Sequence, residues 1–149
     1  MTTEIWDEIL KYGAYSQEFD WFALDKKGNL GAFTAVMNAP IPVKIKSSLK
    51  NYIQITHFID ALPKITVSLL STSENGNFLS WVSYAEKGLF AFDFQDIHRK
   101  DPKNQYDLIA RPLVPLNLRT MNIPSSFLDN MTTLNCEFEK GDLKTENLL

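Results

Sequence analysis

Residues 19–33 have the sequence FDWFALDKKGNLGAF, and this stretch decides the fold. Apolar and aromatic residues form a run on each side of a short polar segment. The segment contains Asp25 and Gly28, residue types that tolerate tight turns and positive φ. Two apolar runs around a short glycine-containing turn are typical of a β-hairpin. We therefore predict that residues 19–25 and 30–36 pair as antiparallel strands.

The turn of this hairpin has a second interpretation, because Asp25, Gly28 and Asn29 are also residue types of calcium-binding loops. The segment lacks the series of oxygen ligands and the closing glutamate that such a loop needs, so we interpret it as a turn. In the first strand, Trp21 alternates with Phe22 and shares its side with Asp25. We expect Trp21 to lie on the less buried face.

Four other segments have the spacing or the end signals of helices. Serine and threonine accept hydrogen bonds from free N–H groups at a helix start, while glycine or proline ends a helix. The expected helices are 3–12 with Thr3 as N-cap and Gly13 as stop, 48–62 with Ser47 or Ser48 as N-cap and Pro63 as stop, 78–85 with Gly88 as stop, and a short helix with Ser125 or Ser126 as N-cap.

The remaining apolar segments favour strands. They are residues 89–94, with Phe90, Phe92 and Phe94 on one side, residues 106–112, and residues 135–139 (NCEFE) as a last strand. Residues 64–71 fit a strand or a helix, and their Ile, Thr and Val content favours a strand. The polar tail from Lys140 is expected to be frayed.

A chain of 149 residues without visible repeats or linkers has the size of one domain. Its strands and helices do not alternate as βαβ units. We therefore predict one α+β domain over residues 1–149, with an antiparallel or mixed sheet and helices packed on one side. Residues 140–149 are expected to form a flexible tail.

The sequence predicts a cytoplasmic protein without a membrane partner. No apolar run approaches the roughly 20 residues that span a bilayer, and the first residues are acidic where a signal peptide is basic. The single cysteine, Cys136, agrees with a reducing compartment. It lies near Glu137 and Glu139, whose charges would raise its pKa, so we expect a core thiol and not a nucleophile.

Charge is distributed unevenly along the chain. Residues 1–25 carry six acidic residues against Lys11, while residues 26–64 carry six lysines against Asp60. The lysines are spread over a turn, a loop and a helix and form no long basic stripe. We therefore expect no nucleic-acid partner.

The sequence contains no glycine-rich phosphate loop, no serine-hydrolase turn and no spaced set of Cys and His ligands. His57 lies in an expected helix without the second ligand at i+4 that a helical zinc motif requires. We therefore predict no metal, no other cofactor and no catalytic residues. His98 has carboxylates nearby that could orient it as a general base, although a solvated loop has the same composition.

Two polar patches are candidates for binding, because each combines carboxylates with an aromatic or planar group at a strand end or turn. The first patch, on the hairpin, is Asp20, Trp21 and Asp25; the second, after the phenylalanine strand, is Asp93, Asp96, His98 and Arg99.

The segments FDWFALDKKGNLGAF, WVSYAEKGLFAFDF and YDLIARPLVPLNL follow one another, with prolines between the first and the second. In this combination the chain resembles small bacterial proteins of the polymorphic-toxin immunity type. The resemblance spans most of residues 19–118 and rests on structural residues. It implies a protein partner, and it assigns no catalytic residue to this chain.

Two hypotheses of function remain. The first is a non-catalytic bacterial binding protein, such as an immunity protein that neutralises a toxin through protein–protein contact; the acidic N-terminal segment would suit a basic partner. The second is a small enzyme or ligand-binding protein with a pocket near Asp93, Asp96 and His98. It requires these three side chains to converge in a cavity.

Overall fold

The predicted hairpin lies at the centre of the fold. The computed structural model, which describes residues 1–15, 17–73 and 75–148, contains β1 (Phe19–Leu24) paired antiparallel with β2 (Leu30–Ala35). Trp21 lies opposite Phe33, and Asp20 lies opposite Thr34. All other strands are added to the two edges of this hairpin.

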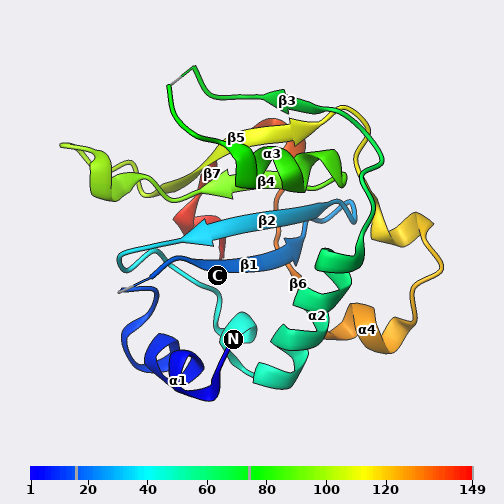
Figure 1. Ribbon diagram of the computed structural model, residues 1–149, viewed down its shortest axis with the longest axis horizontal. Helices are drawn as coiled ribbons and strands as arrows, with labels where there is room; N and C mark the ends of the chain where they lie inside the picture. The colour runs from blue at the N-terminus through cyan, green and yellow to red at the C-terminus, as the bar shows by residue number, and fades with distance from the viewer. Residues whose placement is uncertain (16, 74, 149) are drawn as a thin grey trace.

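The described residues form one seven-stranded mixed sheet with four α-helices (Figure 1). Besides the hairpin, these elements are α1 (Thr3–Tyr12), α2 (Leu49–Ala61), β3 (Ser68–Leu70), α3 (Leu79–Glu86), β4 (Phe90–Asp93), β5 (Gln105–Pro112), α4 (Ser125–Asn130), β6 (Thr132–Thr133) and β7 (Leu143–Lys144). The strand order is β3-β5-β4-β2-β1-β6, and β7 pairs with β5. The prediction of a single α+β domain is confirmed, and β3 shows that residues 68–70 form a strand. None of the helices described is long and apolar enough to cross a membrane.

The expected end signals explain the bounds of α2 and α3. At the start of α2, the Ser48 hydroxyl accepts a hydrogen bond from the Asn51 N–H at 3.2 Å. Gly88 follows α3 with φ of 96°, a left-handed conformation that glycine adopts without strain. The same residue leads directly into β4, so the helix is held close to the sheet.

Two helix starts lie one residue earlier than predicted. The N-cap of α1 is Thr2 and not Thr3, and its hydroxyl accepts a hydrogen bond from the Ile5 N–H at 3.2 Å. The N-cap position of α4 is taken by Pro124, without a side-chain hydrogen bond, and not by a serine. At α1, the adjacent Thr2 and Thr3 have equivalent capping ability, which leaves such a one-residue choice open.

One face of the sheet carries a stack of aromatic rings. Trp21 and Phe33 lie 4.1 Å apart between ring centroids, and Phe33 and Phe92 lie 4.7 Å apart, all nearly parallel. Tyr106 meets Trp21 edge-on, and the Trp21 indole donates a hydrogen bond to its hydroxyl at 3.2 Å. Trp21 is fully buried, so the expectation that it lies on the less buried face is wrong. This face is itself covered, and the alternation within β1 could not reveal that.

The opposite face is covered by three helices. Ile55 and Ile59 of α2 pack with Phe22, Leu30 and other residues that point away from the aromatic stack, together with side chains of α3 and α4. Figure 1 shows α3 in front of β4, with β7 behind the sheet. The fourth helix, α1, packs with the aromatic-face cluster through Trp6. The layer of α2, α3 and α4 provides the surroundings of the candidate site.

The C-terminal segment differs from its prediction. Residues 135–139 are not a strand; a 3-10 helix spans Phe138–Lys140, and the Phe138 ring lies 5.4 Å from that of Phe92. The tail is not frayed in the described residues, because β7 pairs with β5 and Leu148 is buried. Phe138 is the one fully buried residue of NCEFE; Cys136 and Glu137 are half-buried, and Asn135 and Glu139 are exposed.

The turn between β1 and β2 is fixed by the carboxylate of Asp25, which is fully buried. Its oxygens accept hydrogen bonds from the N–H groups of Lys27 and Asn29, both at 2.9 Å, and from the Asn29 side chain at 3.2 Å. A further bond, from the Phe138 N–H at 3.0 Å, joins the turn to the C-terminal segment. One side chain therefore connects the hairpin to the cover of its aromatic face.

We predict that Asp25→Ala strongly destabilises the fold. The change leaves several buried N–H groups without acceptors, and each costs about 1–3 kcal/mol, so a loss of about 3 kcal/mol or more is expected. Urea unfolding followed by circular dichroism measures it. Asp101→Ala, at an exposed aspartate between β4 and β5, is the matched control and should change stability by less than about 0.5 kcal/mol. Equal stability of the two variants would contradict the role given to Asp25.

Candidate functional site

An open groove of about 390 Å³ lies between α3 and the C-terminal end of α2, above β1. Its lining residues are Asp20, Asp60, Leu79, Ser80, Ser83, Tyr84 and Lys87. They come from β1, α2 and α3, and from the residue that follows α3. The groove therefore depends on how the helical layer sits on the hairpin.

Asp20 lies in this groove because of the register of β1. Trp21 points into the aromatic face, so its neighbour Asp20 points toward the helices. The carboxylate accepts hydrogen bonds from the Thr34 hydroxyl at 2.8 Å and from the Tyr84 hydroxyl at 2.7 Å. The Tyr52 hydroxyl donates to the main-chain oxygen of Asp20 at 2.7 Å. Asp20 is thus held in place by neutral donors.

The tyrosines beside Asp20 remain protonated at all ordinary pH values. Burial raises the pKa of Tyr84, and the charge of Asp20 raises it further. Burial raises the pKa of Tyr52 to about 12, and the nearby charges of Asp20 and Asp60 act in the same direction. Both hydroxyls therefore serve as donors and leave the negative charge of Asp20 in place.

The charge balance of the groove is negative. Within the described residues, no ion pair joins Asp20 or Asp60 to a basic side chain. Lys87 lies at the groove as well, but its ammonium donates to the main-chain oxygens of Ile59 and Asp60, at 3.1 and 3.2 Å. Those carbonyls belong to the last turn of α2, where a cation is favoured. Two carboxylates and one ammonium leave a site suited to a cationic group.

The first predicted patch is not one surface. Asp20 lies at the groove, whereas Trp21 and Asp25 are fully buried and cannot touch a partner. Trp21 belongs to the aromatic stack, and Asp25 fixes the turn at the far end of β1. Of the three residues, Asp20 alone is placed to bind a ligand.

The second predicted patch contains an internal ion-pair network. The Arg99 guanidinium contacts the carboxylates of both Asp96 and Asp107. Asp96 also accepts from the N–H groups of Lys103 and Asn104, at 3.0 and 2.8 Å. Burial alone would raise the pKa of Asp96, but these N–H bonds and Arg99 lower it. Both residues are therefore engaged in ordering the loop between β4 and β5.

Among the described residues, no ion pair joins His98 or Asp93 to Asp96 or Arg99, although the charge of His98 lowers the pKa of Asp93. The His98 side chain is exposed. Asp93 is half-buried and pairs in register with Asp107 across β4 and β5. A polar cavity of about 170 Å³ lies nearby, and its lining residues include Arg99 and Asp107 but not Asp93, Asp96 or His98. The convergence required by the enzyme hypothesis is not seen.

Cys136 is not set up as a nucleophile either. Its side chain is half-buried beside the Asp25 turn. Burial raises the pKa of the thiol to about 11, and the charge of Asp25 adds to the effect. The thiol is therefore protonated near neutral pH, whereas a reactive cysteine requires the thiolate.

Sequence reasoning missed a polar row that crosses the sheet. Asp20, Thr34, Asp93 and Asp107 are paired in turn across β1, β2, β4 and β5. Their side chains lie on the helical face, toward one end of the sheet. The residues come from four separate strands, so the only signal that could have found them was the register of pairing.

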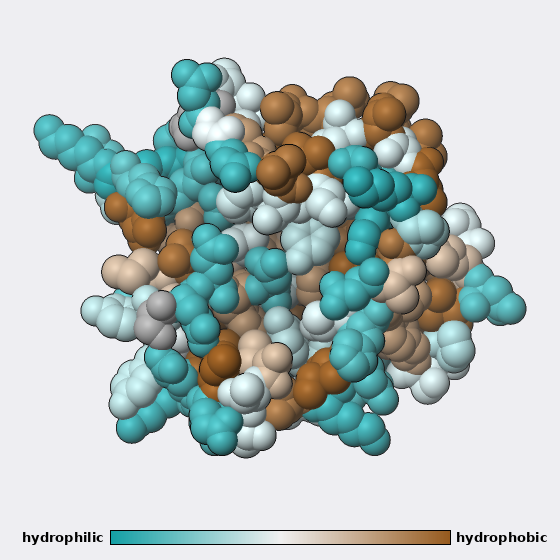
Figure 2. Space-filling view, viewed as in Figure 1, coloured by the Kyte–Doolittle hydropathy of each residue, from teal (hydrophilic) through white to brown (hydrophobic). Residues whose placement is uncertain are grey.

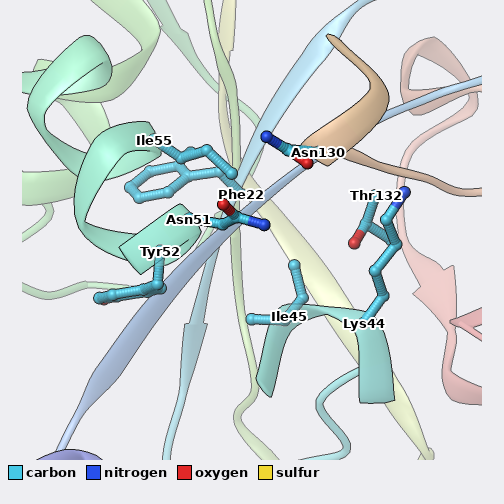
Figure 3. Close-up of a pocket in the computed structure, with 8 residues that line it drawn as sticks. All are labelled: Phe22, Lys44, Ile45, Asn51, Tyr52, Ile55, Asn130 and Thr132. Carbon is cyan, nitrogen blue, oxygen red and sulfur yellow. The ribbon is translucent and has the colours of Figure 1, made fainter. Parts of the chain in front are cut away.

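A much smaller cavity is shown in Figure 3. It has a volume of about 20 Å³ and lies between α2, the segment at Lys44 and β6, with Asn51, Asn130 and Thr132 as polar neighbours. Lys44 donates from its ammonium to the main-chain oxygens of Asp129 and Met131, both at 2.9 Å. A cavity of this size has room for about one water molecule, so it is not a ligand site.

The half-buried Asp93 predicts a pH-dependent stability. Burial raises its pKa from 3.8 to about 6. The charges of Glu18 and Asp107 act in the same direction, whereas the hydrogen bond with Gln95 and the charge of His98 lower it. The folded state therefore favours the protonated carboxyl: this contribution is fully present below about pH 4 and is lost as the pH rises through 6. We expect Asp93→Asn to be more stable than the wild type at pH 7.5 by about 1 kcal/mol, after discounting for solvent screening.

Urea unfolding at pH 4.0 and at pH 7.5 measures the effect. The stability gain of Asp93→Asn should be present at pH 7.5 and absent at pH 4.0. Asp101→Asn, the same change at an exposed position, should show no such difference. A gain that is independent of pH would show that charge burial at Asp93 is not the cause.

In the described parts of the chain, no group of three His, Cys, Asp or Glu side chains is placed to hold a metal ion. The groove is lined by serines and carboxylates but by no histidine or cysteine. Its charged side chains are the two carboxylates of Asp20 and Asp60 and the ammonium of Lys87. Comparison of the chain with protein-family models, with curated proteins and with solved structures finds no match.

Proposed function

We propose that this chain is a non-catalytic binding protein that acts through protein–protein contact, with the groove at Asp20 and Asp60 as the receptor for a basic side chain of its partner. The observation that carries the proposal is the state of Asp20. Its carboxylate is held by two neutral hydroxyls and is paired with no cation in the described residues. A carboxylate that is fixed in this way, without a cationic partner, can form a strong charge-assisted hydrogen bond with a basic side chain of another protein.

A basic side chain suits the groove for reasons of shape as well as charge. The groove is open, and Leu79 at its rim is 74% exposed, so the aliphatic stem of a lysine or arginine would have an apolar surface to lie on. The hydroxyls of Ser80 and Ser83 also line it and offer acceptors at the periphery. The acidic residues Glu4 and Asp7 on α1 would favour the approach of a basic partner.

Neutralisation of a toxin is the specific form of this function that we propose. It rests on the resemblance of the hairpin and the following segments to immunity proteins of polymorphic toxins. A toxin that acts on nucleic acid carries basic residues at its active surface, because it must bind phosphate groups. An acidic groove would occupy one of those residues and block that surface.

We predict that reversing the charge at the groove abolishes the binding of a basic partner. Asp60→Lys places an ammonium beside Asp20 and should weaken binding at least tenfold, since a charge-assisted hydrogen bond contributes about 1.5–3 kcal/mol. Asp101→Lys is the matched control, because it makes the same change of charge at an exposed position outside the groove.

The test is to clone the genes that flank this one and to coexpress each product that is toxic to the cell with this chain. The wild type and Asp101→Lys should restore growth and be copurified with the toxin, whereas Asp60→Lys should do neither. Circular dichroism confirms that each variant is folded. Equal protection by Asp60→Lys and Asp101→Lys would refute the groove as the contact site, and failure of the wild type to protect or to bind would refute the toxin partner.

A further inference from the structure

The outer edge of the sheet at β3 is open. β3 ends the strand order and pairs with β5 alone among the described strands. Two hydrogen bonds bracket the pairing: Leu113 donates to the Val67 oxygen at 3.0 Å, and Ser71 donates to the Ile109 oxygen at 2.8 Å. In an antiparallel ladder such bonds alternate along the strand. The N–H and C=O groups of the intervening Ser68 and Leu70 are therefore directed away from β5.

Aliphatic side chains surround this open edge. Six of them are each about half exposed, namely Ile65, Val67, Leu69, Leu70, Leu113 and Val114. We call these six residues the β3 surface. Figure 2 shows hydrophobic side chains gathered along the upper edge of the molecule, where Figure 1 places β3. Together they present several hundred Å², as much as the largest apolar patch of a typical monomer, about 300–600 Å².

β3 is a short edge strand of three residues, but the β3 surface lacks the other usual protections of an edge. Natural edges carry charged residues, prolines or bulges that prevent pairing with another chain. The nine residues from Ile65 to Ser73, ITVSLLSTS, include no charged residue and no proline. An edge of this kind is expected to be covered by another polypeptide.

We propose that the β3 surface is covered by a second copy of this chain, with the two β3 strands paired antiparallel about a two-fold axis at Leu69. Ser68 of one copy then faces Leu70 of the other, and vice versa. These are the two residues whose N–H and C=O groups are directed outward. The pairing therefore uses every free backbone group of the strand and joins two sheets into one.

The side chains suit this arrangement. The two Leu69 residues form a non-hydrogen-bonded pair at the axis, where opposing side chains lie closest. Val67 shares the face of Leu69 and packs beside it. Because the β3 surface is uncharged, it is complementary to itself, as an isologous interface must be.

The size of the β3 surface also fits a second copy. A standard interface buries about 800 Å² per partner, of which somewhat more than half is apolar. The exposed aliphatic area of the β3 surface is comparable with this apolar part of one partner's interface. Interfaces between copies of one chain are the more apolar class, and the depletion of charge at this edge agrees with them.

The dimer is independent of the groove. The residues that line the groove and those of the β3 surface do not overlap. Monomeric wild type that still protects against a toxin would therefore overturn the dimer alone.

Light scattering of the purified full chain measures its mass in solution. The wild type should have twice the chain mass of 17.0 kDa, about 34 kDa. Leu69→Asp places two carboxylates opposite each other at the axis and should give a monomer. Val43→Asp, at an exposed aliphatic residue outside the β3 surface, is the matched control and should remain a dimer.

Two further variants test the pairing of the backbones. Leu70→Pro removes the outward N–H without touching the bonds to β5, a change that an edge strand accepts. It should weaken dimerisation at least tenfold, whereas Leu70→Val should weaken it less. Leu69→Cys in a Cys136→Ala background should form an intermolecular disulfide on oxidation, because the Cα separation at such a pair is about 4.5 Å. Val43→Cys should not.

Each outcome decides the proposal. A monomeric wild type at concentrations up to about 1 mM, which corresponds to the weakest specific association, would overturn it. A dimer that persists unchanged in folded Leu69→Asp would show that another surface mediates association. A dimer lost in Leu69→Asp but without disulfide formation in Leu69→Cys would overturn the two-fold register at Leu69.

Discussion

The register between β1 and β2 determines the rest of the structure. It is fixed at one end by Asp25, whose carboxylate closes the turn with bonds to the N–H groups of Lys27 and Asn29. A shift of one residue would exchange the two faces of the hairpin. Trp21 would then leave the aromatic stack, and Asp20 would leave the groove. The core and the candidate site are thus two consequences of the same pairing.

The two faces of the sheet have different roles because of this alternation. On one face, rings of β1, β2 and β4 stack directly on one another, and Phe138 covers them. On the other face, Asp20 and Thr34 begin a polar row that continues through Asp93 to Asp107. A rigid aromatic layer beneath a polar row holds its carboxylates in place, as a preformed binding site requires.

The sequence was sufficient for the elements whose signals are local. The hairpin, α2 and the strand at Phe90 have alternation, caps or turn residues within a few positions of each other. The failures concern tertiary contacts. Residues 135–139 alternate between polar and apolar types like a strand, but Phe138 packs in the aromatic cluster from outside the sheet. Trp21 is buried because a distant segment covers its face of the sheet. The groove combines Asp20 with Asp60, 40 positions apart, and only the packing of α2 on β1 brings them together.

The bond from the Phe138 N–H to Asp25 also constrains how the protein is made. It joins residues 113 positions apart. The hairpin is synthesised first, and its turn lacks this partner and its aromatic face lacks its cover until the chain has grown by a further 113 residues. Contacts of such separation close late and slow the formation of the native state. The nascent hairpin therefore exposes Trp21 and Phe33 until Phe138 has left the ribosome. During this interval the hairpin presents its largest apolar surface to a chaperone.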